Sequence, residues 1–266
     1  MSWERYVAIG DSFTEGMSDD DVTAMVDPSQ PERYAGWADR LARHLADLAG
    51  AQGRSFGYAN LAVRGRKLGD IVGPQLGAAL ELRPDLVSMV GGGNDLLRPT
   101  VDLDALAAGL EDAARQLRAA GADVLLATPT DTRDAGLFKA LRARHAIHTA
   151  NIHSIAQRHG CHVLDLWGLR SIQDWRMWSA DRIHLSAEGH RRVASAALVA
   201  LGLEPADAAY REPLPPAPAS ARADQLREHA EWVKVHAAPW VERRVRGTSS
   251  GDALSAKRPR LEPVSR

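Results

Sequence analysis

This chain of 266 residues has one cysteine, no apolar run long enough to span a membrane, and a net charge close to zero. Its single cysteine, Cys161, excludes an internal disulfide and a metal site built from several thiolates. No window approaches the roughly 18 uncharged apolar residues of a membrane-spanning helix. The first residues, Met1 to Arg5, lack the basic and apolar regions of a secretory signal, so we expect a cytoplasmic location. The formal net charge of −1 gives no overall reason to expect nucleic acid or a membrane surface as a partner.

What the chain does have is a regular alternation of short apolar runs with longer segments of helical period. This pattern predicts an α/β fold with a mainly parallel sheet. We expect five strands, at Tyr6–Ile9, Ser55–Asn60, Leu86–Val90, Val124–Thr128 and His162–Leu166. We expect helices at Gly36–Leu48, Leu68–Glu81, Leu103–Ala120, Leu137–Arg158 and Ala187–Leu201. Ser186 is a suitable N-cap for the last of these helices.

The chain beyond this core has a different composition. Residues 205–221 carry five prolines and predict a stiff linker. Residues 222–242 have helical character, and residues 243–266 are basic and rich in Ser, Gly and Pro, which predicts disorder.

Residues able to do chemistry follow the predicted strands. Parallel α/β sheets bind their ligands beyond the carboxyl ends of the strands. Ser12, Gly65 and Asn94 come directly after the first, second and third predicted strands, so we expect them to meet at that edge. Each also has an ordinary structural interpretation, as a capping serine, a helix-entry glycine and a turn asparagine.

Four short segments resemble the conserved blocks of the GDSL or SGNH hydrolases, a family of serine esterases and lipases. They are Gly10–Gly16, Asn60–Gly65, Gly92–Asp95 and Asp181–His184. The resemblance covers roughly residues 5–202 and implies a hydrolase domain over residues 1–204. It also implies a three-layer α/β/α sandwich, flavodoxin-like, around a five-stranded parallel sheet, and catalysis with no cofactor and no metal ion.

The roles that the resemblance implies agree with the chemistry of these side chains. A serine hydroxyl needs a base to become nucleophilic, so Ser12 would attack while His184 takes its proton. Asp181, three residues before His184, would orient the imidazole. The oxyanion hole would be formed by the N–H groups of Ser12 and Gly65 and the amide of Asn94, because fixed donors stabilise the charge that develops on oxygen. We assign Asp95 to holding the loop rather than to chemistry.

Several other residues have two open interpretations. Trp175 and Trp178 either wall the substrate pocket or pack an irregular loop. The segment between Gly16 and Tyr34 either forms part of the pocket rim or is a solvated loop. The histidines of the predicted helices (His145, His148, His153 and His190) are expected to be core or solvated groups.

The leading functional prediction is a serine hydrolase that cleaves small or acyl-chain carboxylic esters through an acyl-enzyme. An alternative is an O-acetyl esterase acting on acetylated carbohydrate. A different class of function is a non-catalytic binding protein that uses the basic tail on nucleic acid, which acidic residues such as Glu242, Asp252 and Glu262 disfavour. The sequence leaves the oligomeric state open.

Overall fold

The computed structural model describes residues 3–19, 35–217, 231–232, 234–235 and 251–264. Its strands are β1 (Arg5–Ile9), β2 (Gly57–Asn60), β3 (Leu86–Met89), β4 (Asp123–Ala127), β5 (His162–Leu164) and β6 (Arg258–Pro263). Its α-helices are α1 (Ser12–Glu15), α2 (Trp37–Ala51), α3 (Leu68–Asp70), α4 (Leu76–Glu81), α5 (Gly93–Leu96), α6 (Leu103–Ala119), α7 (Arg142–His159) and α8 (Ala187–Ala200). A π-helical turn, η1 (Ile71–Gln75), joins α3 to α4, and the 3-10 turns are η2 (Gly136–Leu141), η3 (Arg170–Gln173) and η4 (Trp175–Met177).

The strands form one sheet in the order β5-β4-β3-β1-β2-β6. The first five pair in parallel, with the order expected of a flavodoxin-like doubly wound fold. The predicted three-layer α/β/α sandwich is therefore confirmed, and each predicted strand overlaps an observed one. The predicted helix over Leu68–Glu81 is continuous through η1, which contains Pro74.

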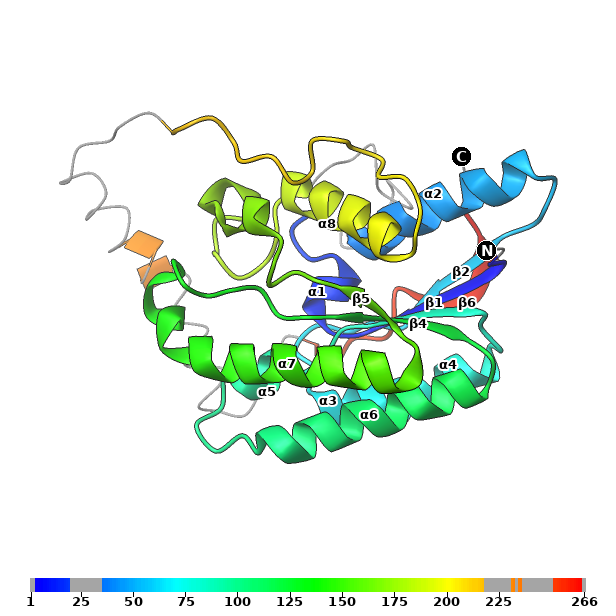
Figure 1. Ribbon diagram of the computed structural model, residues 1–266, viewed down its shortest axis with the longest axis horizontal. Helices are drawn as coiled ribbons and strands as arrows, with labels where there is room; N and C mark the ends of the chain where they lie inside the picture. Colours follow the sequence, from blue (N-terminus) through cyan, green and yellow to red (C-terminus); the bar gives the residue numbers. More distant parts are fainter. Residues whose placement is uncertain (1–2, 20–34, 218–230, 233, 236–250, 265–266) are drawn as a thin grey trace.

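Both faces of the sheet are covered, which explains why its strands read as continuous apolar runs. On one face, Tyr6 and Ala8 of β1 pack with α2 and α8. On the other face, Val7 and Ile9 pack with α3, α4 and α6. Figure 1 shows α2 and α8 on one side of the strands and α3, α4, α6 and α7 on the other.

One prediction about the sheet is wrong. Residues 258–263 add a sixth strand, β6, which pairs antiparallel with the outer edge of β2. The predicted disorder of residues 243–266 is therefore wrong for residues 251–264, while residues 243–250 lie outside the described part of the chain. An open β2 edge has unpaired backbone groups, and β6 satisfies them. Prolines at 259 and 263 obscured this strand, since proline is tolerated mainly in edge strands.

Local signals at the helix ends agree with the predictions. The Ser186 side chain caps α8 by accepting a hydrogen bond from the Gly189 N–H at 3.4 Å.

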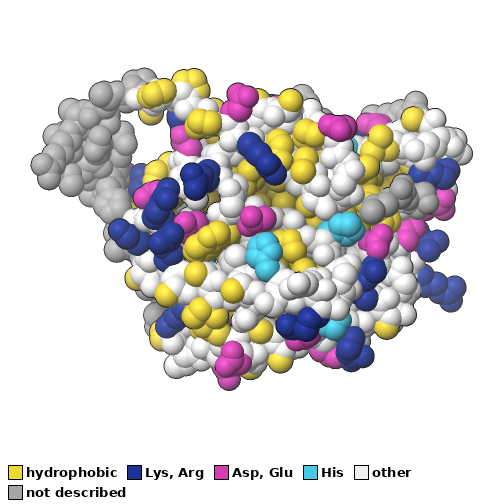
Figure 2. All heavy atoms as spheres, in the orientation of Figure 1, with side chains coloured by type: hydrophobic (Ala, Val, Ile, Leu, Met, Phe, Trp, Pro, Cys, Tyr) yellow, Lys and Arg dark blue, Asp and Glu magenta, His cyan; other side chains and the backbone are white. Residues whose placement is uncertain are grey.

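In the region predicted as a linker, Tyr210 is buried against the core, so this part of the linker packs on the domain. No helix among the described residues is long and apolar enough to cross a membrane. On the face drawn in Figure 2, Lys and Arg side chains lie among acidic and hydrophobic ones.

Candidate active site

Ser12 lies in the turn that joins β1 to α1. Asp11 is the N-cap of α1, and its side chain accepts a hydrogen bond from the Phe13 N–H at 3.0 Å. Gln75 holds Gly10 from both sides, accepting from its N–H at 2.8 Å and donating to its carbonyl at 2.9 Å. These contacts fix the backbone immediately before Ser12, which lines a pocket at this edge of the sheet.

Gly65 and Asn94 lie on neighbouring loops beside this turn. The Asn94 amide donates to Asp11 Oδ2 at 3.2 Å and to the Arg66 carbonyl at 3.0 Å. Gly65, one residue before Arg66, has φ +75°, a conformation that favours glycine. Asn94 lines the same pocket as Ser12. The proposed oxyanion loops therefore contact each other and the Ser12 turn.

Asp95 has the loop-holding role that we expected. Its Oδ2 accepts from the Leu68 N–H at 2.9 Å, which ties the loop after β3 to the start of α3. Beneath the same loop, buried His148 contacts the Gly91 carbonyl through Nε2 at 3.2 Å. Gly92 has φ +95°, and a Cβ there would meet the His148 ring. The expectation of a core role for His148 is confirmed, and the role includes support of the Asn94 loop.

His184 and Asp181 form a hydrogen-bonded pair on the loop before α8. Their Nδ1 and Oδ2 atoms are 2.6 Å apart. The other carboxylate oxygen of Asp181 accepts from the backbone N–H groups of Ile183 and His184 and from the Ser179 hydroxyl. Burial alone would raise the pKa of Asp181, but the hydrogen bond and positive charge of His184 hold it well below its usual range.

The histidine loop comes to the same edge of the sheet as Ser12. Ile183, adjacent to His184, lines the pocket together with Ser12 and Asn94. The hydrogen bonds of the described residues include none between the Ser12 hydroxyl and His184. Catalytic hydrogen bonds are often formed only when substrate is bound. Ile183 and Ser12 thus line one pocket, and the reach of the His184 imidazole to the Ser12 hydroxyl stays a prediction.

Asp11 is a titratable group of this cluster whose pKa is raised. It is buried, and burial raises its pKa from 3.8 to about 6, although the Phe13 N–H and the charge of His184 act in the opposite direction. Its carboxylate lies between the Ser12 turn and Asn94. Sequence reasoning missed this residue because an aspartate before a helix is usually only a cap.

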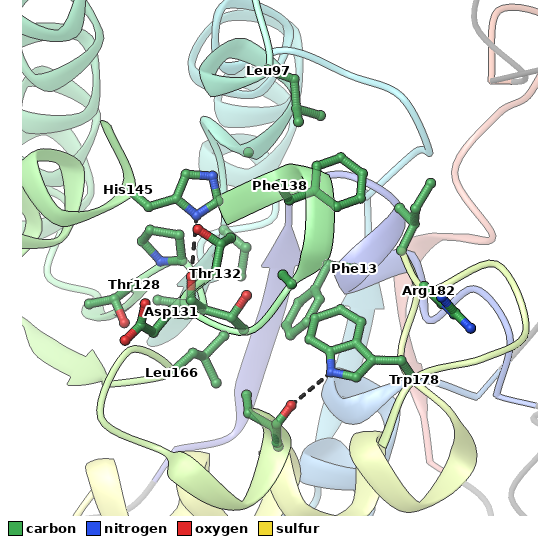
Figure 3. Close-up of a pocket in the computed structure, with 18 of the residues that line it drawn as sticks. Phe13, Leu97, Thr128, Asp131, Thr132, Phe138, His145, Leu166, Trp178 and Arg182 are labelled. Atoms are coloured by element: carbon green, nitrogen blue, oxygen red, sulfur yellow. Dashed lines mark hydrogen bonds between the residues drawn. The ribbon is translucent and has the colours of Figure 1, made fainter. Parts of the chain in front are cut away.

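The pocket has a volume of about 220 Å³ and two chemically different sides. Figure 3 shows Phe13, Phe138 and Trp178 gathered on one side, with Arg182 beside Trp178. Thr128, Asp131, Thr132 and His145 lie on the opposite side. Trp175 and Trp178 both line the pocket, and the Trp178 indole donates to the Ile172 carbonyl at 2.7 Å.

Sequence reasoning also missed the residues that the loop after β4 contributes. Thr128, Asp131 and Thr132 follow that strand, and Phe138 and His145 come from η2 and α7. His145 Nδ1 lies 3.2 Å from the Thr130 carbonyl. Their position beyond the carboxyl end of a parallel strand was the available signal. The segment at 20–34, considered for the pocket rim, lies outside the described residues.

No cluster of three His, Cys, Asp or Glu side chains in the described part of the chain could hold a metal ion.

Comparisons with known proteins identify the family of this chain. Residues 8–192 match the sequence model of the GDSL-like lipase/acylhydrolase family. The chain belongs to this family. The match includes all four sequence blocks and ends within α8. A comparison with curated protein sequences finds no similar one.

Several solved structures share the fold. One is LAE5, an α/β hydrolase from the metagenome of Lake Arreo, Spain, with 25% identity, a TM-score of 0.61, and coverage of 75% of this chain and 95% of that chain. Another is Axe2, an acetylxylan esterase from Geobacillus stearothermophilus, with 20% identity, a TM-score of 0.62, and coverage of 76% and 95%. A third is TesA, with 22% identity, a TM-score of 0.56, and coverage of 74% and 98%. Family and fold together make this chain an acylhydrolase.

Proposed function

We propose that this acylhydrolase cleaves carboxylic esters of small substrates through an acyl-enzyme formed on Ser12. The observation that carries the proposal is the pocket that Ser12 shares with Asn94 and with Ile183, the neighbour of His184. The bond from His184 Nδ1 to Asp181 adds to this support, because it leaves Nε2 for the serine.

In the proposed reaction, Ser12 Oγ attacks the ester carbonyl carbon and His184 takes the hydroxyl proton. The negative charge on the carbonyl oxygen is stabilised by the N–H groups of Ser12 and Gly65 and by the Asn94 amide. The bond to the alcohol oxygen then breaks as His184 returns the proton to it. Water then attacks the carbonyl carbon of the acyl-serine while His184 takes a proton from it. The bond from that carbon to Ser12 Oγ breaks as His184 returns the proton to Oγ, and the acid is released. The strong Asp181 acceptor stabilises the imidazolium in both steps.

The dimensions of the pocket favour a small acyl group. Sites for drug-sized ligands have roughly 300–1,000 Å³, whereas this pocket has about 220 Å³. Phe13, Phe138 and Trp178 give it an apolar side that would bury a short chain. An acetyl group also fits this volume, so the second candidate is an O-acetyl esterase acting on acetylated carbohydrate. Trp175, which is 39% exposed where it borders the pocket, offers a ring on which a sugar could stack.

The binding-protein alternative has less support. Lys257 and Arg258, two cations of the basic tail, have side chains that are only 8% exposed, so they are poorly placed to contact phosphates. The cytoplasmic location stays a prediction.

The proposal is tested by hydrolysis of 4-nitrophenyl esters of increasing chain length by the wild type and by Ser12→Ala. Turnover should fall by at least 10³-fold in Ser12→Ala, because loss of the nucleophile removes the acyl-enzyme route. A variant that folds and keeps more than a few percent of wild-type turnover would refute the assignment. Release of acetate from acetylated xylo-oligosaccharides, compared with the simple esters, distinguishes the two substrate classes.

A further inference from the structure

The C-terminal segment 251–264 lies against the part of the site that carries Gly65. The family match ends at residue 192, so this segment is an addition to the matched domain. It nevertheless reaches the sheet, where β6 pairs with β2 and Arg258 lies over the Tyr58 ring at 5.5 Å. Figure 1 shows the red C-terminal strand beside β2, the strand that leads into the Gly65 loop.

Gly251 contacts the peptide unit that contains the Gly65 N–H. It is buried, and a Cβ there would overlap the Arg64 carbonyl oxygen. In a trans peptide the Arg64 carbonyl and the Gly65 N–H point in opposite directions. A backbone packed against the carbonyl side therefore limits rotation of the N–H on the other side. Arg66 extends the contact, since its guanidinium donates to the Gly251 carbonyl at 3.5 Å.

Lys257 holds the helix that begins with Ser12. Its ammonium group donates to the Glu15 carbonyl at 2.5 Å and to Asp39 Oδ2 at 2.6 Å. Its side chain is 8% exposed and that of Asp39 is 4% exposed, so the ion pair is buried. The last carbonyl of α1 thus receives a cationic donor, which the helix dipole favours.

Glu15 links Lys257 to the Gly65 loop. Its carboxylate accepts from the Arg64 N–H at 2.6 Å and pairs with the Arg64 guanidinium at 2.5 Å. Displacement of the end of α1 would therefore shift Arg64, and with it the peptide that carries the Gly65 N–H.

We propose that residues 251–264 are a positioning element of the oxyanion hole, with Gly251 fixing the Arg64–Gly65 peptide and Lys257 fixing the end of α1. This inference rests on the proposed function, since it assigns a task to the Gly65 N–H. Gly251 and Lys257 act through Gly65 and Ser12 and are positioning residues rather than catalytic ones.

The first test separates positioning from stability. Lys257→Met alone leaves the Asp39 carboxylate buried without its cation, which destabilises the fold. The double variant Lys257→Met/Asp39→Asn removes both charges and should recover most of the lost melting temperature. The Glu15 carbonyl still lacks its donor in the double variant. We therefore expect kcat to stay about 10-fold below that of the wild type with KM within about 2-fold, a smaller loss than removal of an oxyanion donor gives.

A second variant does not touch the ion pair. Gly251→Ala places a methyl group against the Arg64 carbonyl and should also lower kcat about 10-fold with little change in KM. Arg260→Met, at an exposed position of β6, is the matched control and should leave both constants within 2-fold of wild type. Rates are expressed per active site, counted by titration with a fluorophosphonate, so that partial unfolding does not imitate a catalytic loss.

The outcomes distinguish the inference from the proposed function. If wild-type Ser12 reacts with the fluorophosphonate but both Gly251→Ala and the double variant keep kcat within 2-fold of wild type, the positioning role is refuted and the proposed function stands. If Arg260→Met lowers kcat as much as Gly251→Ala does, the effect is general to the strand and the inference also fails. If Ser12 in the wild type does not react, the proposed function fails and the inference fails with it.

Discussion

Replacement of Asp11 by asparagine should change the stability of the protein in a way that depends on pH. Asp11 is buried, and burial raises its pKa from 3.8 to about 6. Between these two pH values the folded state binds the proton more tightly than the unfolded state, so stability falls as pH rises. Above pH 6 the buried carboxylate is ionised, and its burial then lowers the free energy of unfolding by roughly 3 kcal/mol. Asparagine caps a helix as well as aspartate does and does not titrate.

The net effect of Asp11→Asn includes one lost contact. The amide NH2 replaces the oxygen that accepts from Asn94, and this costs about 1 kcal/mol at every pH. The variant should therefore be more stable than the wild type by roughly 2 kcal/mol at pH 8. At pH 5 much of the wild-type cost is already absent, so this advantage should shrink by roughly 1–2 kcal/mol.

Urea unfolding of both proteins at pH 5 and pH 8 measures this difference. The free energy of unfolding falls by roughly 2–3 kcal/mol per molar urea. The difference between the urea midpoints of the variant and the wild type should therefore change by about half a molar between the two pH values. Asp102→Asn is the matched control, because Asp102 caps α6 in the same manner but is exposed, so solvent screens its charge. An advantage of Asp11→Asn that is equal at the two pH values, or that is larger at pH 5, would refute the reasoning from burial.

Two further predictions concern the pair that orients the base and the wall of the pocket. Asp181→Asn should lower kcat by roughly 10²–10⁴-fold with little change in KM, because the amide no longer favours the correct tautomer and the imidazolium of His184. It should also remove stability that the wild type has above about pH 4 and loses as the pH falls further, since the pKa of Asp181 is held low in the folded state, and acid unfolding curves test this. Phe138→Ala should enlarge the apolar side and shift the best 4-nitrophenyl ester by a few carbons toward longer acyl chains, whereas an unchanged chain-length profile would show that Phe138 does not limit the acyl group.

Much of the fold was predictable because its signals are local. Both faces of β4 are buried, so Val124 to Ala127 is an unbroken apolar run, and the Ser186 cap marks the start of α8. The family match confirms the predicted class of enzyme, and the likeness to solved structures confirms the predicted fold. The order of the strands places the three sequence blocks that follow β1, β2 and β3 at one edge.

The remaining features depend on contacts between residues far apart in the sequence. β6 has little strand propensity, and it gains a partner only at the β2 edge, where Arg258 pairs with Asn60, 198 positions earlier. The raised pKa of Asp11 arises from burial under loops of several elements, and the pocket side formed by Phe138 and His145 depends on the path of the chain after β4. No periodicity or local spacing encodes such contacts.

The most direct test of the account is to locate the site of reaction with a fluorophosphonate on the intact protein by peptide mass spectrometry. We expect stoichiometric modification of Ser12, no modification in Ser12→Ala, and a strongly slowed reaction in His184→Ala, since the serine then lacks its base. Modification of a different residue, or equal rates in the wild type and His184→Ala, would contradict it.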